Sequence, residues 1–354
     1  MLSNFVQPGK VSLIIDGQFG STGKGLIASR IAYDNHIDVC AASLSPNAGH
    51  TFYKWNAEEK LITKLLPVCG ILKKRSTIYL SPESVINEDL LIEEIEKFNI
   101  ENICIHPRAS IVQTNPNTYD KELAKIGSTL QGTGPARASK ILRKNPLIFK
   151  SNKLKKYIDE GIIDLEEIDL NFYLDQGCSV LIESGQGIDL GLNYGLSYPY
   201  CTSRDVLPAN LLADFGIHPK YLGNIMLTFR TYPIRVGNPI DNNGNEIGYS
   251  GPFFPDSKEI TWKELNQKPE LTTVTKRIRR IATFSKKQFE HSIDLVKPSH
   301  IFLNFINYLN QQDIVFFNKL FLKRKEKIFV GYDKFPFSIS PLEPQTLQNY
   351  FLKF

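Results

Sequence analysis

Residues 11–25 read Val-Ser-Leu-Ile-Ile-Asp-Gly-Gln-Phe-Gly-Ser-Thr-Gly-Lys-Gly. The apolar run from Val11 to Ile15 predicts a buried strand, and the residues from about Lys24 to Tyr33 predict a helix. The glycine-rich turn between them presents backbone N–H groups at a helix N-terminus, where the helix dipole favours an anion. Lys24 adds a positive charge. The stretch therefore favours a phosphate-binding loop over an ordinary strand-to-helix turn.

Composition limits the class of protein. The chain has 354 residues, of which 42% are hydrophobic, so it can build a sizeable core. Its net charge is +5 without a long block of Lys and Arg, which disfavours direct nucleic-acid binding. The five cysteines are scattered and form no CxxC pair, so neither a disulfide framework nor a zinc site is predicted. No segment approaches membrane-spanning length. We expect a cytoplasmic protein without a membrane partner.

Short apolar runs alternate with helical patterns, which is typical of an α/β fold. The expected strands are residues 102–106, 179–183, 224–231, 300–309 and 327–331. A helix is expected over Asn87–Phe98, and another begins at Ser285, with Gln288 as its capping-box partner. We find no internal repeat or linker. The sequence therefore predicts a single catalytic domain over residues 1–354, with a mostly parallel central sheet, flanking helices and loop excursions.

Further segments carry side chains suited to phosphate, purine and carboxylate binding. They are Ser-Pro-Asn-Ala-Gly-His-Thr at 45–51, Gly-Ser-Thr-Leu-Gln-Gly-Thr-Gly-Pro at 127–135, Glu-Ser-Gly-Gln-Gly-Ile-Asp at 183–189, Tyr-Pro-Tyr-Cys-Thr-Ser at 198–203, and Thr-Thr-Val-Thr-Lys-Arg-Ile-Arg-Arg at 272–280. His50 can act as an acid, the second glycine-rich segment suggests a second phosphate, and Gln186 suits a purine edge. Arginine forks at 277–280 match a dicarboxylate. A surface histidine, a mobile loop and an exposed basic helix start are the simpler alternatives.

In order, these segments resemble the motifs of the adenylosuccinate synthetase family. Its Gly-Asp-Glu-Gly-Lys-Gly loop corresponds to residues 20–25, and its Asn-Ala-Gly-His-Thr motif is intact at 47–51. Its Glu-Gly-Ala-Gln-Gly and Thr-Thr-Gly-Arg-x-Arg-Arg motifs correspond to 183–187 and 274–280. The resemblance implies a homodimer and a two-step ligation with Mg²⁺. The purine 6-oxygen attacks the γ-phosphate of a nucleoside triphosphate, and the amine of aspartate then displaces the phosphate.

The resemblance also assigns roles to residues. The implied catalytic residues are Ser21, Lys24 and His50, and Mg²⁺ would be bound by Ser21 and the carbonyl of Gly49. The triphosphate site would comprise Gly20, Thr22, Gly23, Lys24, Gly25, His50, Thr51, Asn304, Phe305 and Asn307. The monophosphate site would comprise Ser21, Asn47, Ser128, Thr129, Gln186 and Thr202, with Arg143 supplied across the dimer interface. Aspartate would be held by Thr273, Thr275, Arg277 and Arg279.

Two departures from the family pattern fall at chemically decisive positions. Ser21 stands where the family has the acid that removes the N1 proton of hypoxanthine, and its shorter side chain leaves space for the 2-amino group of guanine. Residues 304–307 (Asn-Phe-Ile-Asn) replace the family's Thr-Lys-Leu-Asp. A carboxamide at Asn307 does not accept two hydrogen bonds from guanine as a carboxylate does, but it is compatible with adenine.

Together the departures resemble the bacteriophage branch of the family, which joins aspartate to dGMP with ATP and gives 2-amino-deoxyadenylosuccinate for 2-aminoadenine DNA. Two alternatives stay open at this point. One is an ordinary adenylosuccinate synthetase that uses inosine monophosphate and GTP, with its acid supplied by Asp16 or Asp189. The other is a nucleotide-binding protein without catalytic activity.

Overall fold

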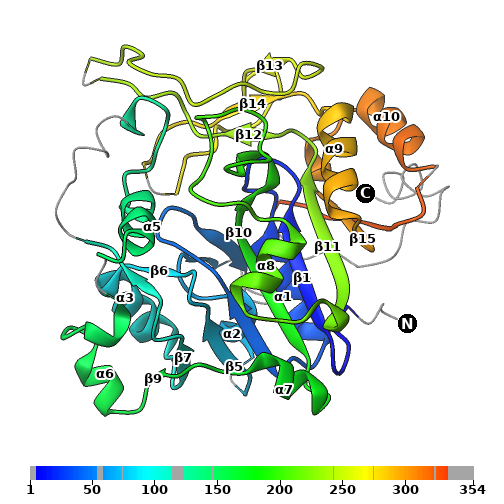
Figure 1. Cartoon of the computed structure of the whole chain (residues 1–354). Coiled ribbons are helices and arrows are strands. Elements are labelled where there is room, and N and C mark those ends of the chain that lie inside the picture. Colours follow the sequence, from blue (N-terminus) through cyan, green and yellow to red (C-terminus); the bar gives the residue numbers. More distant parts are fainter. Residues whose placement is uncertain are drawn as a thin grey trace.

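The fold is given by a computed structural model, which describes residues 5–53, 59–73, 75–113, 123–144, 147–241, 243–273, 275–322 and 324–333. A nine-stranded sheet forms its centre (Figure 1). From one edge to the other the strands are β16 (Lys327–Val330), β15 (His300–Asn304), β11 (Leu222–Arg230), β1 (Val11–Asp16), β10 (Val180–Gly187), β2 (Val39–Ala42), β5 (Thr77–Leu80), β7 (Ile103–Ile105) and β9 (Ile163–Leu165). Every neighbouring pair is parallel, so the predicted α/β fold with a mostly parallel sheet is confirmed.

Helices cover both faces of this sheet, because successive side chains of each buried strand point to opposite sides. In β1, Leu13 belongs to a core that contains residues of α7, α8, α9 and α10, whereas Ile14 belongs to a core shared with α1 and α2. Residues of α3 extend the second layer toward β7. The helices are α1 (Lys24–Asp34), α2 (Val68–Leu72), α3 (Glu88–Phe98), α5 (Thr133–Ile141), α6 (Lys155–Asp159), α7 (Leu170–Asp175), α8 (Pro208–Asp214), α9 (Lys286–Val296) and α10 (Gln311–Phe321).

Three small sheets extend from this framework. An antiparallel hairpin pairs β3 (His50–Tyr53) with β4 (Lys60–Thr63), and β6 (Val85–Ile86) pairs with β8 (Ser110–Ile111). The third sheet has the order β12 (Ile234–Arg235), β14 (Arg280–Ala282), β13 (Glu259–Ile260) and encloses a core of its own with Trp262. These sheets are the loop excursions predicted from the sequence.

Two local predictions need correction. The strand expected over residues 300–309 ends at Asn304, because Phe305 adopts a left-handed conformation (φ 64°) that extended backbone cannot contain. The capping box expected at Ser285 is only half formed. The Ser285 hydroxyl accepts from the backbone N–H of Gln288, but the Gln288 side chain turns inward and donates to Asp189 (2.6 Å).

The side chain of Gln288 contacts a buried acid, Asp189. Burial raises the pKa of Asp189 to about 8, so the carboxyl is neutral at pH 7. Its Oδ1 has no hydrogen-bond partner within the described residues, nor has Oε1 of Gln288. The folded state therefore retains a proton that the unfolded chain releases above about pH 4.

We expect Asp189→Asn to flatten part of the pH dependence of stability. In the native chain the contribution of this proton is present below about pH 4 and is lost as the pH rises toward 8. The difference in unfolding free energy between variant and native chain should thus change by up to about 1.4 kcal/mol per pH unit in this range. Urea unfolding at pH 5 and pH 8 measures it, and a difference independent of pH would contradict the burial of a protonated Asp189.

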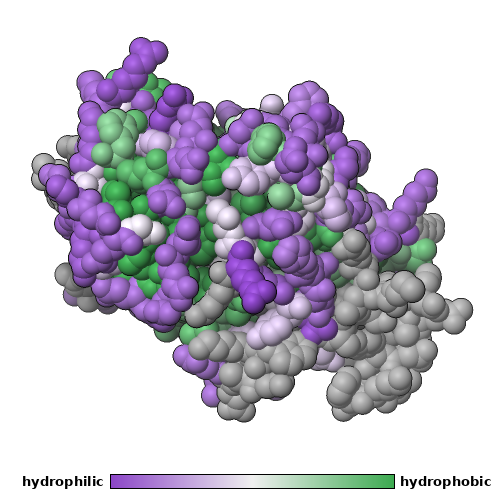
Figure 2. All heavy atoms as spheres, turned by 90° about the horizontal axis from the view of Figure 1, so that it is seen from below, coloured by the Kyte–Doolittle hydropathy of each residue, from purple (hydrophilic) through white to green (hydrophobic). Residues whose placement is uncertain are grey.

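The sheet sets the place of the functional site. β1 lies between β10 and β11, and the carboxyl ends of these three parallel strands lie on the same side of the molecule. Ligands of open parallel sheets bind at the carboxyl ends of the strands. The opposite end, viewed from below in Figure 2, mixes hydrophilic and hydrophobic side chains over the part shown in colour. Among the helices of the described ranges, none combines the length and apolar character needed to cross a membrane.

Candidate active site

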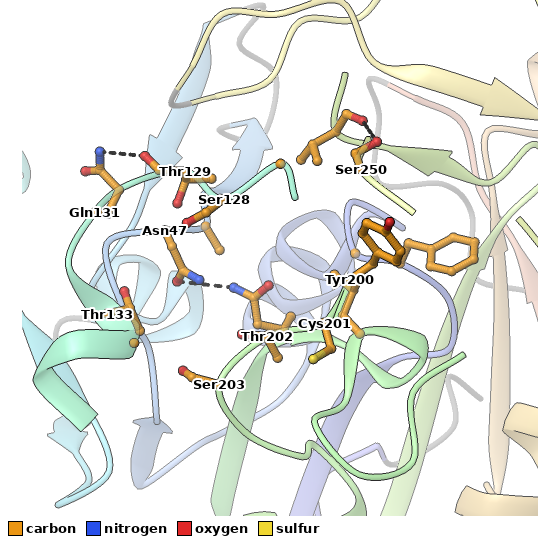
Figure 3. A pocket seen from close by; sticks show the side chains of 18 of the residues that line it. Asn47, Ser128, Thr129, Gln131, Thr133, Tyr200, Cys201, Thr202, Ser203 and Ser250 are labelled. Atoms are coloured by element: carbon orange, nitrogen blue, oxygen red, sulfur yellow. Dashed lines mark hydrogen bonds between the residues drawn. The ribbon is translucent and has the colours of Figure 1, made fainter. Parts of the chain in front are cut away.

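A cavity of about 390 Å³ opens beside the carboxyl ends of the central strands (Figure 3). It is lined by residues of the first glycine-rich loop, the 47–50 segment, the second glycine-rich loop, the end of β10, the 198–203 segment and the 272–279 loop. The site residues that the structure brings together here are Gly20, Ser21, Lys24, Asn47, Gly49, His50, Ser128, Thr129, Gln186, Thr202, Thr273 and Arg279. No Asp or Glu side chain occurs in the lining that is described.

The first loop is organised around Asp16, a role that the sequence analysis missed. The carboxylate is fully buried and accepts from the backbone N–H groups of Gln18 (2.9 Å), Gly20 (3.2 Å) and Thr22 (3.2 Å). It also accepts from the Thr22 hydroxyl and from Lys24 Nζ (3.1 Å). Two residues of the predicted triphosphate site, Gly20 and Thr22, therefore direct their backbone N–H groups to Asp16. The available signal was an Asp directly before the glycine-rich turn, where its side chain can accept from the backbone N–H two residues later.

Lys24 remains beside the cavity. It is 6% exposed, and its Nζ lies 3.1 Å from the carbonyl of Gln186 as well as from Asp16. This geometry requires the end of β10 to approach the loop closely. A side chain at Gly187 would meet the Gln18 carbonyl at 2.2 Å, so only glycine allows the contact. The ammonium group is thus held at the junction of the two segments.

His50 is positioned by Glu183. Nδ1 of the imidazole lies 3.4 Å from the Glu183 carboxylate, which is fully buried and also accepts from the backbone N–H of Cys69 (2.8 Å). β3 carries His50 and lies against the first turn of α1, where a side chain at Gly25 would meet the Thr51 carbonyl at 2.5 Å. A carboxylate beside one ring nitrogen fixes the orientation of the ring. The arrangement suits an acid that faces the cavity.

Amide and hydroxyl groups form another part of the lining (Figure 3). Gln186 Nε2 donates to Oδ1 of Asn47 (3.3 Å), and Gln131 Nε2 donates to the carbonyl of Thr129 (3.2 Å). Thr202 is fixed by a hydrogen bond from its backbone N–H to Leu190 (2.7 Å). These groups can bind a sugar, a base edge or a phosphate without carrying a charge themselves.

Arg235 and Arg279 give the cavity fixed positive charge. Arg279 was predicted, whereas Arg235 was missed because a lone arginine in a short strand has no distinguishing local pattern. Arg235 donates to the carbonyls of Ser250 (Nε, 3.0 Å) and Tyr200 (Nη2, 3.2 Å), and it stacks on Phe19 at 4.5 Å. Burial lowers the pKa of both arginines to about 10, so both are cations at neutral pH. With Lys24, the cavity is suited to anionic ligands.

The remaining predicted site residues do not line this cavity. They are Thr22, Gly23, Gly25, Thr51, Asn304, Phe305, Asn307, Arg143, Thr275 and Arg277. Asn304 is buried and donates to the carbonyl of Thr22 (2.6 Å), and Phe305 lies under the guanidinium of Arg230. Asn307 is exposed and accepts from the backbone N–H of Asp333 (3.2 Å). The structure therefore places the segment expected to read the triphosphate base outside the cavity.

Comparisons with known proteins agree on one family. Residues 13–150 and 144–321 match the family model for adenylosuccinate synthetase. The N6-succino-2-amino-2'-deoxyadenylate synthases of Vibrio phage phiVC8 and Salmonella phage PMBT28 are 38% and 35% identical. Each alignment covers 86% of this chain, and it covers 89% of the first relative and 87% of the second. The cyanophage S-2L succinoaminodeoxyadenylate synthetase, solved with dGMP and with dATP as an energy donor, superposes with a TM-score of 0.83 at 31% identity, over 97% of this chain and 99% of the other.

Proposed function

Because the chain belongs to the adenylosuccinate synthetase family, we propose that it is an ATP-dependent ligase that joins L-aspartate to dGMP. The products are 2-amino-deoxyadenylosuccinate, ADP and phosphate, and the product serves the synthesis of 2-aminoadenine DNA. The chain acts as one catalytic domain in the cytoplasm of a host cell. Its relatives support this proposal, since phage enzymes named for this product are 35–38% identical to it.

One observation in the site carries the proposal. Ser21 lines a cavity whose described lining holds no carboxylate, so the acid expected for inosine monophosphate is not replaced by a neighbour. Asp16 cannot take its place in this geometry, because its two oxygens are occupied by the loop amides, Thr22 and Lys24. Asp189 is buried and protonated at neutral pH, so it is no base there. A serine leaves room beside the purine where guanine carries its 2-amino group.

The reaction takes place in two steps. The 6-oxygen of guanine attacks the γ-phosphorus, the bond to the bridging oxygen of ADP breaks, and the N1 proton is released. The amine of aspartate then attacks C6, and phosphate leaves with the former 6-oxygen. Lys24 and His50 stabilise the transferring phosphoryl group. Asn47, Thr129, Gln186 and Thr202 hold dGMP. Thr273 and Arg279 hold aspartate from the cavity lining, and Thr275 and Arg277 of the same loop, which do not line the cavity, complete the proposed aspartate site.

The site is compatible with Mg²⁺. Magnesium prefers oxygen ligands and is commonly bound by a few protein groups together with phosphates and water. The hydroxyl of Ser21 and the carbonyl of Gly49 belong to segments that line the same cavity, and they are the ligands we propose. The ion would offset negative charge on the phosphates.

Phosphate release by the purified protein tests the function. The assay contains aspartate and Mg²⁺ with each pairing of dGMP or inosine monophosphate with ATP, dATP or GTP. We expect turnover with dGMP and an adenine triphosphate. Turnover only with inosine monophosphate and GTP would establish an ordinary adenylosuccinate synthetase. Nucleotide binding without phosphate release would instead indicate a protein that has lost catalysis.

We also propose that the protein is a homodimer in which Arg143 reaches the partner's monophosphate. Arg143 is exposed, follows α5, and is preceded by two exposed apolar residues, Ile141 (79%) and Leu142 (63%). Arg143→Ala should raise the KM for dGMP by about tenfold and leave the KM for ATP unchanged, because one charge-assisted contact is lost. Steady-state kinetics and light scattering measure these outcomes. A monomeric native protein would contradict the shared site.

A further inference from the structure

An ion pair between buried Arg230 and partly exposed Glu270 connects β11 with two loops that line the cavity. Arg230 ends β11, and its side chain is fully buried. Its Nη2 lies 2.6 Å and its Nη1 3.3 Å from the two oxygens of Glu270, in a forked arrangement. Burial alone would raise the pKa of Glu270, but the Arg230 guanidinium outweighs it and holds that pKa below its ordinary value. Both charges are therefore present and paired at neutral pH.

Arg230 also fixes the first loop at Ser21. The same Nη1 donates to the backbone carbonyl of Ser21 (3.2 Å), a residue in the left-handed conformation (φ 57°) that a non-glycine residue seldom adopts. Such a conformation persists only where surrounding contacts determine it. The guanidinium further lies over the ring of Phe305 at 4.0 Å, which braces it from the other side.

Glu270 fixes the 272–279 loop. Its backbone carbonyl accepts from the N–H of Arg279 (2.8 Å), and its carboxylate is tied to Arg230. The turn between them is closed by the Arg277 N–H, which donates to the Thr272 hydroxyl (2.9 Å). Glu270 thus connects Arg230, through its carboxylate, with the backbone of Arg279, a residue that lines the cavity.

We propose that the Arg230–Glu270 pair is a positioning device. It keeps the first glycine-rich loop, which carries Ser21, and the 272–279 loop, which carries Arg279, in a fixed position relative to each other. Neither residue is among those that line the cavity in the described chain, so both act through Ser21 and Arg279. The inference rests on the proposed function, because it takes Arg279 as a residue that binds aspartate. A group displaced by about 1 Å can cost on the order of 10²-fold in rate, so such a link has a measurable effect.

Two conservative variants test the link. Lysine at position 230 cannot contact both oxygens of Glu270 and the Ser21 carbonyl at once, and glutamine at position 270 keeps the shape but loses the charge. We expect Arg230→Lys and Glu270→Gln each to raise the KM for aspartate by about tenfold. Arg230→Lys should also lower kcat by about tenfold, because it releases Ser21 as well. The KM for dGMP should change less than twofold in Glu270→Gln, because this variant leaves the contact between Arg230 and the Ser21 carbonyl in place.

Arg324→Lys is the matched control. Arg324 contacts both oxygens of Glu326 (3.1 and 2.8 Å) and lies 5.5 Å from the ring of Phe289, but it does not line the cavity. It should lower the thermal unfolding midpoint without changing either KM. If Arg230→Lys does not fold, Glu270→Gln decides. Variants that lose stability but keep the aspartate KM would overturn the positioning role, whereas a native protein that releases no phosphate would instead contradict the proposed function.

Discussion

His50→Asn is expected to lower kcat by about 10³-fold with dGMP, ATP and aspartate, which is the usual contribution of a positioned acid. Asparagine approximates the shape of the imidazole and can donate a hydrogen bond, but it cannot carry a proton to the reacting oxygen. His50 is 5% exposed and held by Glu183, so the substitution should leave the fold intact. Single-turnover phosphate release measures the chemical step directly.

Glu183→Gln tests whether Glu183 acts on His50 by orienting its ring or by the negative charge of its carboxylate. Glutamine can keep contact with Nδ1 of His50 and with the N–H of Cys69, but it carries no negative charge. We expect kcat to fall by about tenfold, less than for His50→Asn, since partners behind a functional group usually contribute on this scale. If both variants retain the native kcat, the reaction does not use His50 as an acid, and Lys24 must carry the stabilisation alone.

The fold was largely accessible from local patterns. Buried strands of a parallel sheet are continuous apolar runs, so 11–15 and 179–183 were recognisable without knowledge of their partners. Asn87 and Ser285 were recognisable as helix starts because their side chains accept from backbone N–H groups three residues later. The predicted extension of β15 failed at Phe305, where a left-handed backbone conformation is held by tertiary contacts that no local pattern reveals.

Site residues could be predicted from the sequence only where they lie in a continuous motif. The loops that contribute Ser21, Asn47 and Gln186 are short segments, and each is recognisable by itself. In contrast, Glu183 and His50 lie 133 positions apart, and Arg230 and Glu270 lie 40 positions apart. In each pair one residue lies on a strand of the central sheet, Glu183 on β10 and Arg230 on β11, and its partner comes from a segment outside that sheet. A single sequence does not show that the residues of such a pair are close in space.

Ser21→Asp should exchange the acceptor specificity of the ligase. Aspartate is among the residues that tolerate the left-handed conformation of position 21 (φ 57°), so the backbone can stay as it is. The longer side chain fills the space that we assign to the 2-amino group, and it supplies the base that inosine monophosphate needs. We expect turnover of dGMP to fall by at least about 10²-fold, with inosine monophosphate becoming a substrate. Phosphate release with each acceptor, at saturating ATP and aspartate, measures both changes.

Ser21→Ala is the control for this exchange, because it removes the hydroxyl but keeps the space. It should retain the preference for dGMP and lower kcat, in line with a hydroxyl that binds Mg²⁺. Together, Ser21→Asp and Ser21→Ala separate the effect of side-chain size at position 21 from the effect of the functional group. A carboxylate can also accept hydrogen bonds from guanine N1–H and N2–H₂. If Ser21→Asp binds dGMP more tightly and turns it over faster, position 21 recognises the purine by hydrogen bonding, and the argument from space is wrong.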